Sequence, residues 1–172
     1  GSNLWFLARE GFDCYGIDGS PSAIKQAKAL LNNDHLEAEY RVGDVIDLPY
    51  PDNFFDAVID VSAIQHNKLQ NVRAIYQQAM RVLKPGGVFM SHCINEHTTI
   101  TEFAGNPEPN TYDSPKPLDS VLIHFFTKEE LMDITRDAGL TQVQINALLK
   151  SSMNQDYNLG HYVVTGKKPN GV

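Results

Sequence analysis

The chain has 172 residues and a net charge of -7; 42% of its residues are hydrophobic and 20% are charged. These values fit one soluble globular domain over residues 1–172. The acidic balance argues against a nucleic-acid partner, because nucleic-acid binders usually present a basic face. Since no apolar run approaches the roughly 18 residues that a membrane span needs, we expect no membrane association either.

Helical and strand-like patterns alternate along the chain. Helices are predicted over 3–10, from Pro21 behind the N-cap residue Ser20, before the sequence KPGG, and after Thr127, which can form a capping box with Glu130. Strands are predicted at 12–18, 37–42, 54–61, 88–93, 141–148 and 160–168. This order predicts an α/β sheet with crossover helices that ends with a C-terminal pair of strands.

Apolar residues at helical spacing mark the faces that three of these helices are expected to bury. The three sets are Ala23, Ala27, Leu30 and Leu31; Val72, Ile75, Tyr76, Ala79 and Leu83; and Leu131, Ile134 and Ala138.

Both cysteines, Cys14 and Cys93, fall in apolar, strand-like stretches. This placement is typical of buried thiols in a reducing compartment. We therefore expect a cytoplasmic protein.

Residues 98–121 are the least regular part of the sequence and hold four of its nine prolines. A loop of about 20 residues in a compact domain is usually functional or disordered. We interpret 98–123 as a substrate lid or insertion, with Glu102, Phe103 and Tyr112 as pocket residues. The alternative is a surface excursion without function. The polar connection 149–159 is the other variable element.

Asp18 ends the predicted strand FDCYGID. An acidic residue at this position in a nucleotide-binding sheet accepts hydrogen bonds from ribose hydroxyls, about 20 residues after the first glycine of a phosphate or cofactor loop. If Gly1 is the third glycine of such a loop, the spacing to Asp18 fits. The alternative is an ordinary turn residue, because aspartate is common where strands end.

Three successive segments share a more specific pattern: GIDGSPSAIKQAKA, GDVIDLPYPDNFFDAVID and IYQQAMRVLKPGGVFM. Together they resemble the class I S-adenosylmethionine-dependent methyltransferases that act on small molecules. The resemblance covers roughly residues 1–94, and HFFTKEELMDITRDAGL at 124–140 is similar to a later helix of that family. It implies S-adenosylmethionine as cofactor, S-adenosylhomocysteine as product and a small-molecule methyl acceptor.

The resemblance also implies a set of cofactor-binding residues. Asp18 would hold the ribose hydroxyls, and Asp44 would accept a hydrogen bond from the adenine amino group. Gly19 and Ser20 would line the adenosine edge, and Val45 would lie beside the adenine ring. Val61 and Ser62 would border the methionine end, and Gly1 would be a glycine of the cofactor loop.

His66 follows the predicted strand 54–61 on the expected ligand side of the sheet. Methyl transfer is an in-line displacement, and a general base assists where the acceptor carries a proton. His66 is therefore the candidate catalytic residue. The alternative is a helix-entry histidine that bonds local backbone. His92, Cys93, Glu96 and His97 match no metal-ligand spacing, so we expect no metal.

The resemblance implies an α/β fold with a Rossmann-like, doubly wound, mostly parallel sheet and a C-terminal antiparallel strand pair. That fold has a further strand between those assigned to 12–18 and 54–61, and the chain has no residues to form it. We therefore expect an N-terminally truncated fold that is part of a longer protein. The alternatives are that the sheet closes up or that another chain supplies the strand, and exposed edges would favour a homo-oligomer.

Two further functions stay open on the sequence alone. The chain can be a non-catalytic, methyltransferase-like binding or scaffold module, which cofactor affinity would distinguish from an enzyme. A nicotinamide-dependent dehydrogenase has a similar sheet and a similar Asp18. The segments around Asp44 and RVLKPGG argue against the dehydrogenase, because they resemble methyltransferase motifs.

Overall fold

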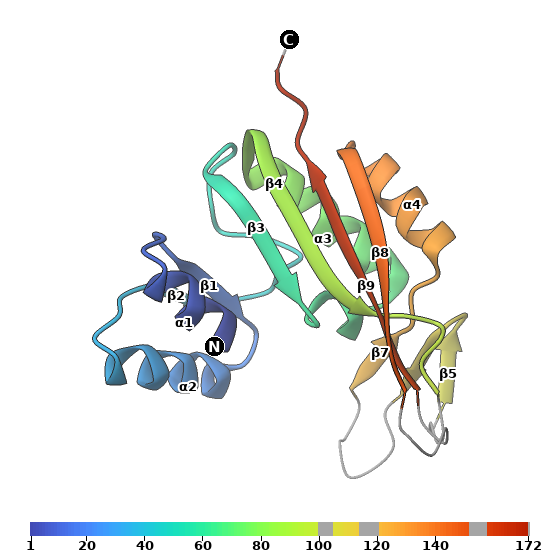
Figure 1. The fold of residues 1–172 in the computed structure, drawn as a ribbon, viewed down its shortest axis with the longest axis horizontal. Helices are drawn as coiled ribbons and strands as arrows, with labels where there is room; N and C mark the ends of the chain where they lie inside the picture. The colour runs from blue at the N-terminus through green and yellow to red at the C-terminus, as the bar shows by residue number, and fades with distance from the viewer. Residues whose placement is uncertain (100–104, 114–120, 152–157, 172) are drawn as a thin grey trace. The chain divides into compact units, whose positions relative to one another are not determined.

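A computed structural model describes residues 1–99, 105–113, 121–151 and 158–171. They form two compact units, Gly1–Pro49 and Tyr50–Val172 (Figure 1). That 1–172 is a single domain stays a prediction.

The N-terminal unit has two helices and a parallel strand pair. Their bounds are α1 (Ser2–Arg9), β1 (Tyr15–Asp18), α2 (Pro21–Asn33) and β2 (Glu39–Val42). β1 and β2 pair in register from Tyr15 opposite Glu39 to Asp18 opposite Val42. Gly16 allows α1 to approach β1 closely, since a Cβ there would lie 2.9 Å from Leu4 Cδ2.

The predicted start of α2 is confirmed. The Ser20 hydroxyl accepts a hydrogen bond from the Ala23 amide at 3.3 Å, and Pro21 is the first helical residue. The predicted buried face is partly wrong, because the helix buries Ile24, Ala27 and Leu31, whereas the Leu30 side chain is 37% exposed. The buried residues follow an i, i+3, i+7 pattern that leaves position 30 off the stripe.

A four-stranded mixed sheet organises the C-terminal unit, in the order β3-β4-β9-β8. β3 and β4 are parallel, and β9 is antiparallel to both β4 and β8. This arrangement confirms the predicted C-terminal antiparallel pair, although both strands extend further than expected. The bounds are β3 (Phe55–Val61), β4 (Leu83–Ile94), β8 (Thr141–Ser151) and β9 (Asn158–Lys167).

Helices α3 (Leu69–Val82) and α4 (Lys128–Asp137) cover one face of this sheet (Figure 1). The predicted stripe of α3 is buried, and its Tyr76 ring lies 4.7 Å from Phe89 of β4. The capping box of Thr127 and Glu130 at the start of α4 is also confirmed. Of the predicted α4 face, Leu131 and Ile134 are fully buried.

The segment KPGG at 84–87 ends α3 but does not form a separate turn. β4 begins directly at Leu83, and a register shift against β3 lies between Phe55 and Ala57. Gly86 has a φ of 78°, and a Cβ on Gly87 would lie 2.8 Å from the Lys84 carbonyl oxygen. Both glycines are needed because the strand leaves the helix without a spacer.

Residues 105–124 contain a second, antiparallel sheet that the sequence did not predict. Its strands are β5 (Gly105–Glu108), β6 (Thr111–Asp113) and β7 (Leu122–His124), in that order. The prolines of this segment favoured the prediction of a loop. Pro107 nevertheless lies on the edge strand β5, where a missing N–H is tolerated. Two predicted pocket residues, Glu102 and Phe103, lie outside the described residues.

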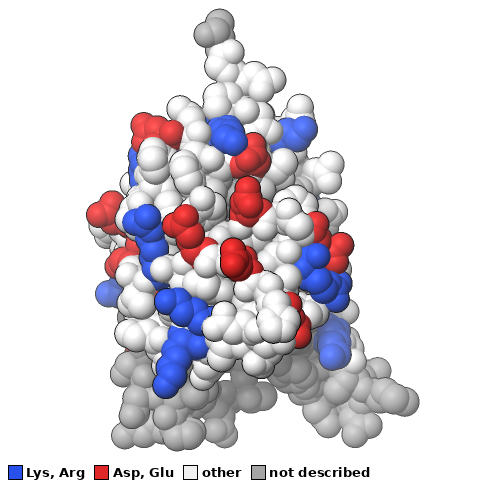
Figure 2. Space-filling view, turned by 90° about the vertical axis from the view of Figure 1, so that its left-hand side faces the viewer, with Lys and Arg blue, Asp and Glu red and all other residues white. Residues whose placement is uncertain are grey.

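Cys14 and Cys93 are both buried free thiols, as predicted. Among the described residues, no helix is long and apolar enough to cross a membrane. Figure 2 shows both acidic and basic side chains of the described residues on the face that it draws. That this protein has no nucleic-acid partner stays a prediction.

Glu130 links the small sheet to α4. Its Oε2 accepts from the Thr127 amide at 2.8 Å and lies 3.5 Å from His124 Nε2 of β7. Burial alone would raise the pKa of Glu130, but His124, the Thr127 amide and the Asn110 side chain outweigh burial and lower it to about 2.

This lowered pKa predicts acid sensitivity. The stabilisation is complete above the ordinary carboxyl range and is lost as pH falls toward 2, since only the unfolded chain takes up the proton there. Between about pH 7 and about pH 3 the native protein should lose on the order of 2 kcal/mol more unfolding free energy than Glu130→Gln. Urea denaturation at both pH values measures this; equal losses would contradict it.

Candidate functional site: the carboxyl edges of the parallel strands

Parallel pairing brings five of the predicted cofactor residues to one edge of the N-terminal unit. Asp18 and Val42 are the last paired residues of β1 and β2, and the Gly43 amide donates to the Asp18 carbonyl at 3.1 Å. The predicted residues therefore follow the two strands side by side. They are Asp18 as the last residue of β1, Gly19 and Ser20 directly after it, and Asp44 and Val45 after β2.

Asp18 is both a turn residue and an exposed acceptor. Its Oδ1 accepts from the Ser20 amide at 2.8 Å, which turns the chain into α2. The side chain is exposed, and a carboxylate has lone pairs for several donors. A vicinal pair of hydroxyl groups fits such an acceptor.

Asp44 has the same construction on the neighbouring strand. Its Oδ1 accepts from the Ile46 amide at 3.0 Å, and its carbonyl accepts from the Asp47 amide at 3.2 Å. The residue is exposed, while Val45 beside it is half-buried. This edge therefore presents two acidic acceptors and an apolar side chain.

The two predicted cofactor glycines of this unit, Gly19 and Gly1, differ in the space around them. At Gly19, a Cβ would meet only the Gly43 carbonyl oxygen, at 3.9 Å, so the fold leaves space in front of this backbone. At Gly1, a Cβ would lie 2.7 Å from Ala27 Cα, and the Gly1 carbonyl accepts from the Trp5 amide at 2.9 Å. Gly1 thus has a packing role here, and its cofactor role stays a prediction.

In the C-terminal unit, the predicted residues Val61 and Ser62 stand where β3 ends. Val61 pairs with His92, and the Ser62 amide donates to the His92 carbonyl at 2.8 Å. Ser62 has a φ of 62°, a conformation unusual for a residue with a side chain. The chain therefore turns sharply out of the sheet at Ser62.

The buried carboxylate of Asp60 holds this turn. Its Oδ1 accepts from the amides of Ala63 (3.0 Å) and Ile64 (3.1 Å), and its Oδ2 accepts from the Ser91 hydroxyl at 2.7 Å. Burial raises the pKa of Asp60, and these hydrogen bonds offset the rise only in part. Asp60 was not among the residues predicted from the sequence, although an acidic residue inside the mostly apolar run FFDAVIDV was a signal.

His66 ends the short helix η1 (Ile64–His66) that follows the turn. Its Nδ1 lies 2.8 Å from the Leu122 carbonyl oxygen of β7. A carbonyl only accepts, so Nδ1 carries the proton, and Nε2 of the neutral ring is the free base. The alternative of a bond to local backbone is wrong for this nitrogen, because its partner lies 56 residues along the chain.

Cys93, His92 and His161 are weaker candidates for a functional role. Burial, with the charge of Asp60 next, raises the pKa of Cys93 to about 12, which keeps the thiol protonated and unreactive. The rings of His92 and His161 stack at 4.4 Å, a contact that depends on the β4–β9 register. In the part of the chain that the structure describes, no group of three His, Cys, Asp or Glu side chains could hold a metal ion.

Comparison with known proteins identifies the family and the fold of the chain. Residues 1–91, more than half of the chain, match the family described as methyltransferase domain, and the chain belongs to that family. A structure of an S-adenosylmethionine-dependent methyltransferase from Methanosarcina mazei superposes with a TM-score of 0.74 at 19% identity, covering 96% of this chain and 86% of that one. The fold is therefore the Rossmann-like α/β methyltransferase fold.

Two curated relatives illustrate the range of similarity. Ajmaline N-methyltransferase of Rauvolfia serpentina is 33% identical over 96 residues, which are 54% of this chain and 32% of that protein. A ubiquinone biosynthesis O-methyltransferase of Paramagnetospirillum magneticum is 34% identical over 175 residues, or 94% of this chain and 66% of that protein. Over the first three curated relatives that it matches, the ajmaline enzyme among them, the chain spans about a third of their length.

The network around Asp60 gives a prediction for two substitutions. Asp60→Ala leaves two turn amides and the Ser91 hydroxyl without their acceptor and should cost about 2–3 kcal/mol of unfolding free energy. Asp60→Asn should cost clearly less, because an amide can accept from the turn, donate to Ser91 and avoid a buried charge. Urea denaturation measures both, and equal costs would contradict this account.

The raised pKa of Asp60 adds a pH dependence to that comparison. Since the folded state holds this proton more tightly than the unfolded chain, the stabilisation from protonated Asp60 is present at low pH. It is lost as pH rises through the folded-state pKa. The native protein should therefore lose stability relative to Asp60→Asn as pH rises from about 4.

Proposed function

We propose that this chain carries out S-adenosylmethionine-dependent methyl transfer to a small-molecule acceptor. The observation that supports this most is the edge of the β1–β2 pair, where the exposed carboxylates of Asp18 and Asp44 follow adjacent parallel strands. Ligands of open α/β sheets bind outside the carboxyl ends of the strands. Membership of the methyltransferase-domain family supports S-adenosylmethionine as the ligand of that edge.

The residues of this edge fit an adenosine group. Asp18 would accept from the ribose hydroxyls, with Gly19 and Ser20 along the adenosine edge. Asp44 would accept from the adenine amino group, with Val45 against the ring. The space in front of Gly19 supports close approach of a ligand to the backbone. Bound S-adenosylmethionine would supply an electrophilic methyl group and leave as S-adenosylhomocysteine.

In the C-terminal unit, Val61 and Ser62 remain predicted contacts of the methionine end. His66 is the proposed general base where the acceptor carries a proton, since its exposed ring has Nε2 free as an acceptor. Its contact with Leu122 supports the interpretation of residues 98–123 as an acceptor-side insertion. We also place the protein in the cytoplasm, because both of its cysteines are buried free thiols.

Gly19→Ala separates binding from folding. The added methyl meets no atom closer than 3.9 Å, so the variant should fold with unchanged stability. It should weaken S-adenosylhomocysteine binding by roughly tenfold or more, because the methyl would enter the ligand's space. Gly171→Ala is the matched control, since its Cβ would also meet open space, and it should leave affinity unchanged. Calorimetric titration measures all three proteins.

Asp18→Ala tests the ribose contact in the same titration. Loss of charge-assisted hydrogen bonds to two hydroxyls should weaken binding by about 10- to 100-fold. Binding that neither Gly19→Ala nor Asp18→Ala reduces would contradict the proposed site. If the native chain itself does not bind S-adenosylhomocysteine, the proposed activity fails and a non-catalytic binding module takes its place.

A further inference from the structure

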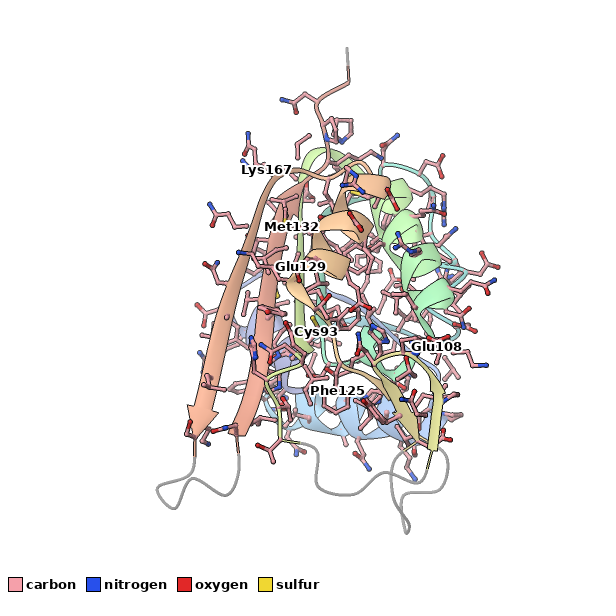
Figure 3. All side chains as sticks on the ribbon, turned by 90° about the vertical axis from the view of Figure 1, so that its right-hand side faces the viewer. Cys93, Glu108, Phe125, Glu129, Met132 and Lys167 are labelled. Carbon is pink, nitrogen blue, oxygen red and sulfur yellow. The ribbon has the colours of Figure 1, made fainter. Side chains whose placement is uncertain are left out.

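Two hydrogen bonds tie the segment between η1 and α3 to the small antiparallel sheet. His66 Nδ1 donates to the Leu122 carbonyl of β7 at 2.8 Å. Three residues further on, the Leu69 amide donates to Glu108 Oε1 of β5 at 2.7 Å. Figure 3 shows Glu108 on β5 beside this segment. The two outer strands of the sheet therefore each bind one point of the segment that carries His66.

Glu108 supplies a capping acceptor for the first turn of α3, which the residues next to the helix do not provide. The N-cap residue Lys68 makes no side-chain hydrogen bond to the helix, and the first turn holds no acidic residue. The first amides of a helix need acceptors, and a negative charge is favourable at this end. A carboxylate 39 residues away in sequence thus caps α3, which makes the cap a tertiary link.

The same carboxylate also connects to β7 through Thr111. The Thr111 hydroxyl donates to Glu108 Oε1 at 3.1 Å, and its oxygen lies 2.7 Å from His124 Nδ1. Thr111 and His124 face each other in the β6–β7 register, and both side chains are fully buried. The position of Leu122, two residues before His124, is therefore fixed relative to Glu108.

We propose that Glu108 is a positioning residue for His66. It locks the small sheet to the start of α3, so that the Leu122 carbonyl holds Nδ1–H and leaves Nε2 as the base. This inference rests on the proposed function for its catalytic meaning, because a base that takes a proton from an acceptor needs its lone pair at the exposed nitrogen. The tautomer of His66 itself does not depend on that function.

The experiment reads the His66 ring directly by NMR. Long-range proton–nitrogen correlation spectra distinguish a protonated from an unprotonated ring nitrogen at a pH where histidine is neutral. The His66 signals are assigned by their loss in His66→Gln. In the native chain, Nδ1 should be the protonated nitrogen. A spectrum with Nε2 as the main protonated nitrogen would overturn the inference.

Variants of Glu108 then test its role. In Glu108→Ala, the tautomer ratio should shift toward Nε2–H by roughly fivefold, the factor that one ordinary hydrogen bond contributes. Glu108→Gln should retain the native ratio, because its amide oxygen can still accept from the Leu69 amide. Glu129→Ala is the control: Glu129 is an exposed acidic residue in the first turn of α4, visible in Figure 3.

A native tautomer ratio in folded Glu108→Ala would overturn the inference, as would an equal shift in Glu129→Ala. If Glu108→Ala does not fold, Glu108→Asp replaces it, because its shorter side chain withdraws the carboxylate from Leu69 and predicts the same shift. S-adenosylhomocysteine titration of the native chain tests the proposed function separately, so loss of cofactor binding with a responsive His66 ring would reject only that function.

Discussion

Parallel strand pairing is the constraint on which the candidate site depends. In each unit, two parallel strands end at the same edge, and an aspartate at or next to the strand end accepts amides of the turn that follows. Asp18 does this after β1 and Asp60 at the end of β3. Without the parallel register, the segments after neighbouring strands would not meet.

The two aspartates differ in what surrounds them. Asp18 is exposed and keeps acceptor capacity for a ligand, whereas Asp60 is buried and its hydrogen bonds go to the turn amides and to Ser91. A buried carboxylate is costly unless it is well bonded. Asp60 therefore shapes the turn that leads to His66, and Asp18 is the proposed acceptor for a ligand.

The sequence predicted those features that local rules determine. The Ser20 cap, the Thr127–Glu130 capping box and the α3 stripe depend on residues within a few positions of one another, and all three are confirmed. The contacts of His66 with Leu122 and of Leu69 with Glu108 join distant segments, and no spacing rule finds them. The sheet of β5, β6 and β7 was not predicted, because the prolines of this segment favoured a loop. The proposed cofactor residues were predicted through family resemblance rather than through composition or periodicity.

The proposed function requires that the carboxyl edge of β1 and β2 binds the adenosine part of the cofactor. Backbone amide spectra recorded during titration with S-adenosylhomocysteine would show this binding residue by residue. We expect the amides of Gly19, Ser20, Asp44 and Val45 to shift together along one binding curve, while a nicotinamide dinucleotide leaves them in place. Amides that stay unchanged with S-adenosylhomocysteine, or that respond to the nicotinamide dinucleotide instead, would contradict it.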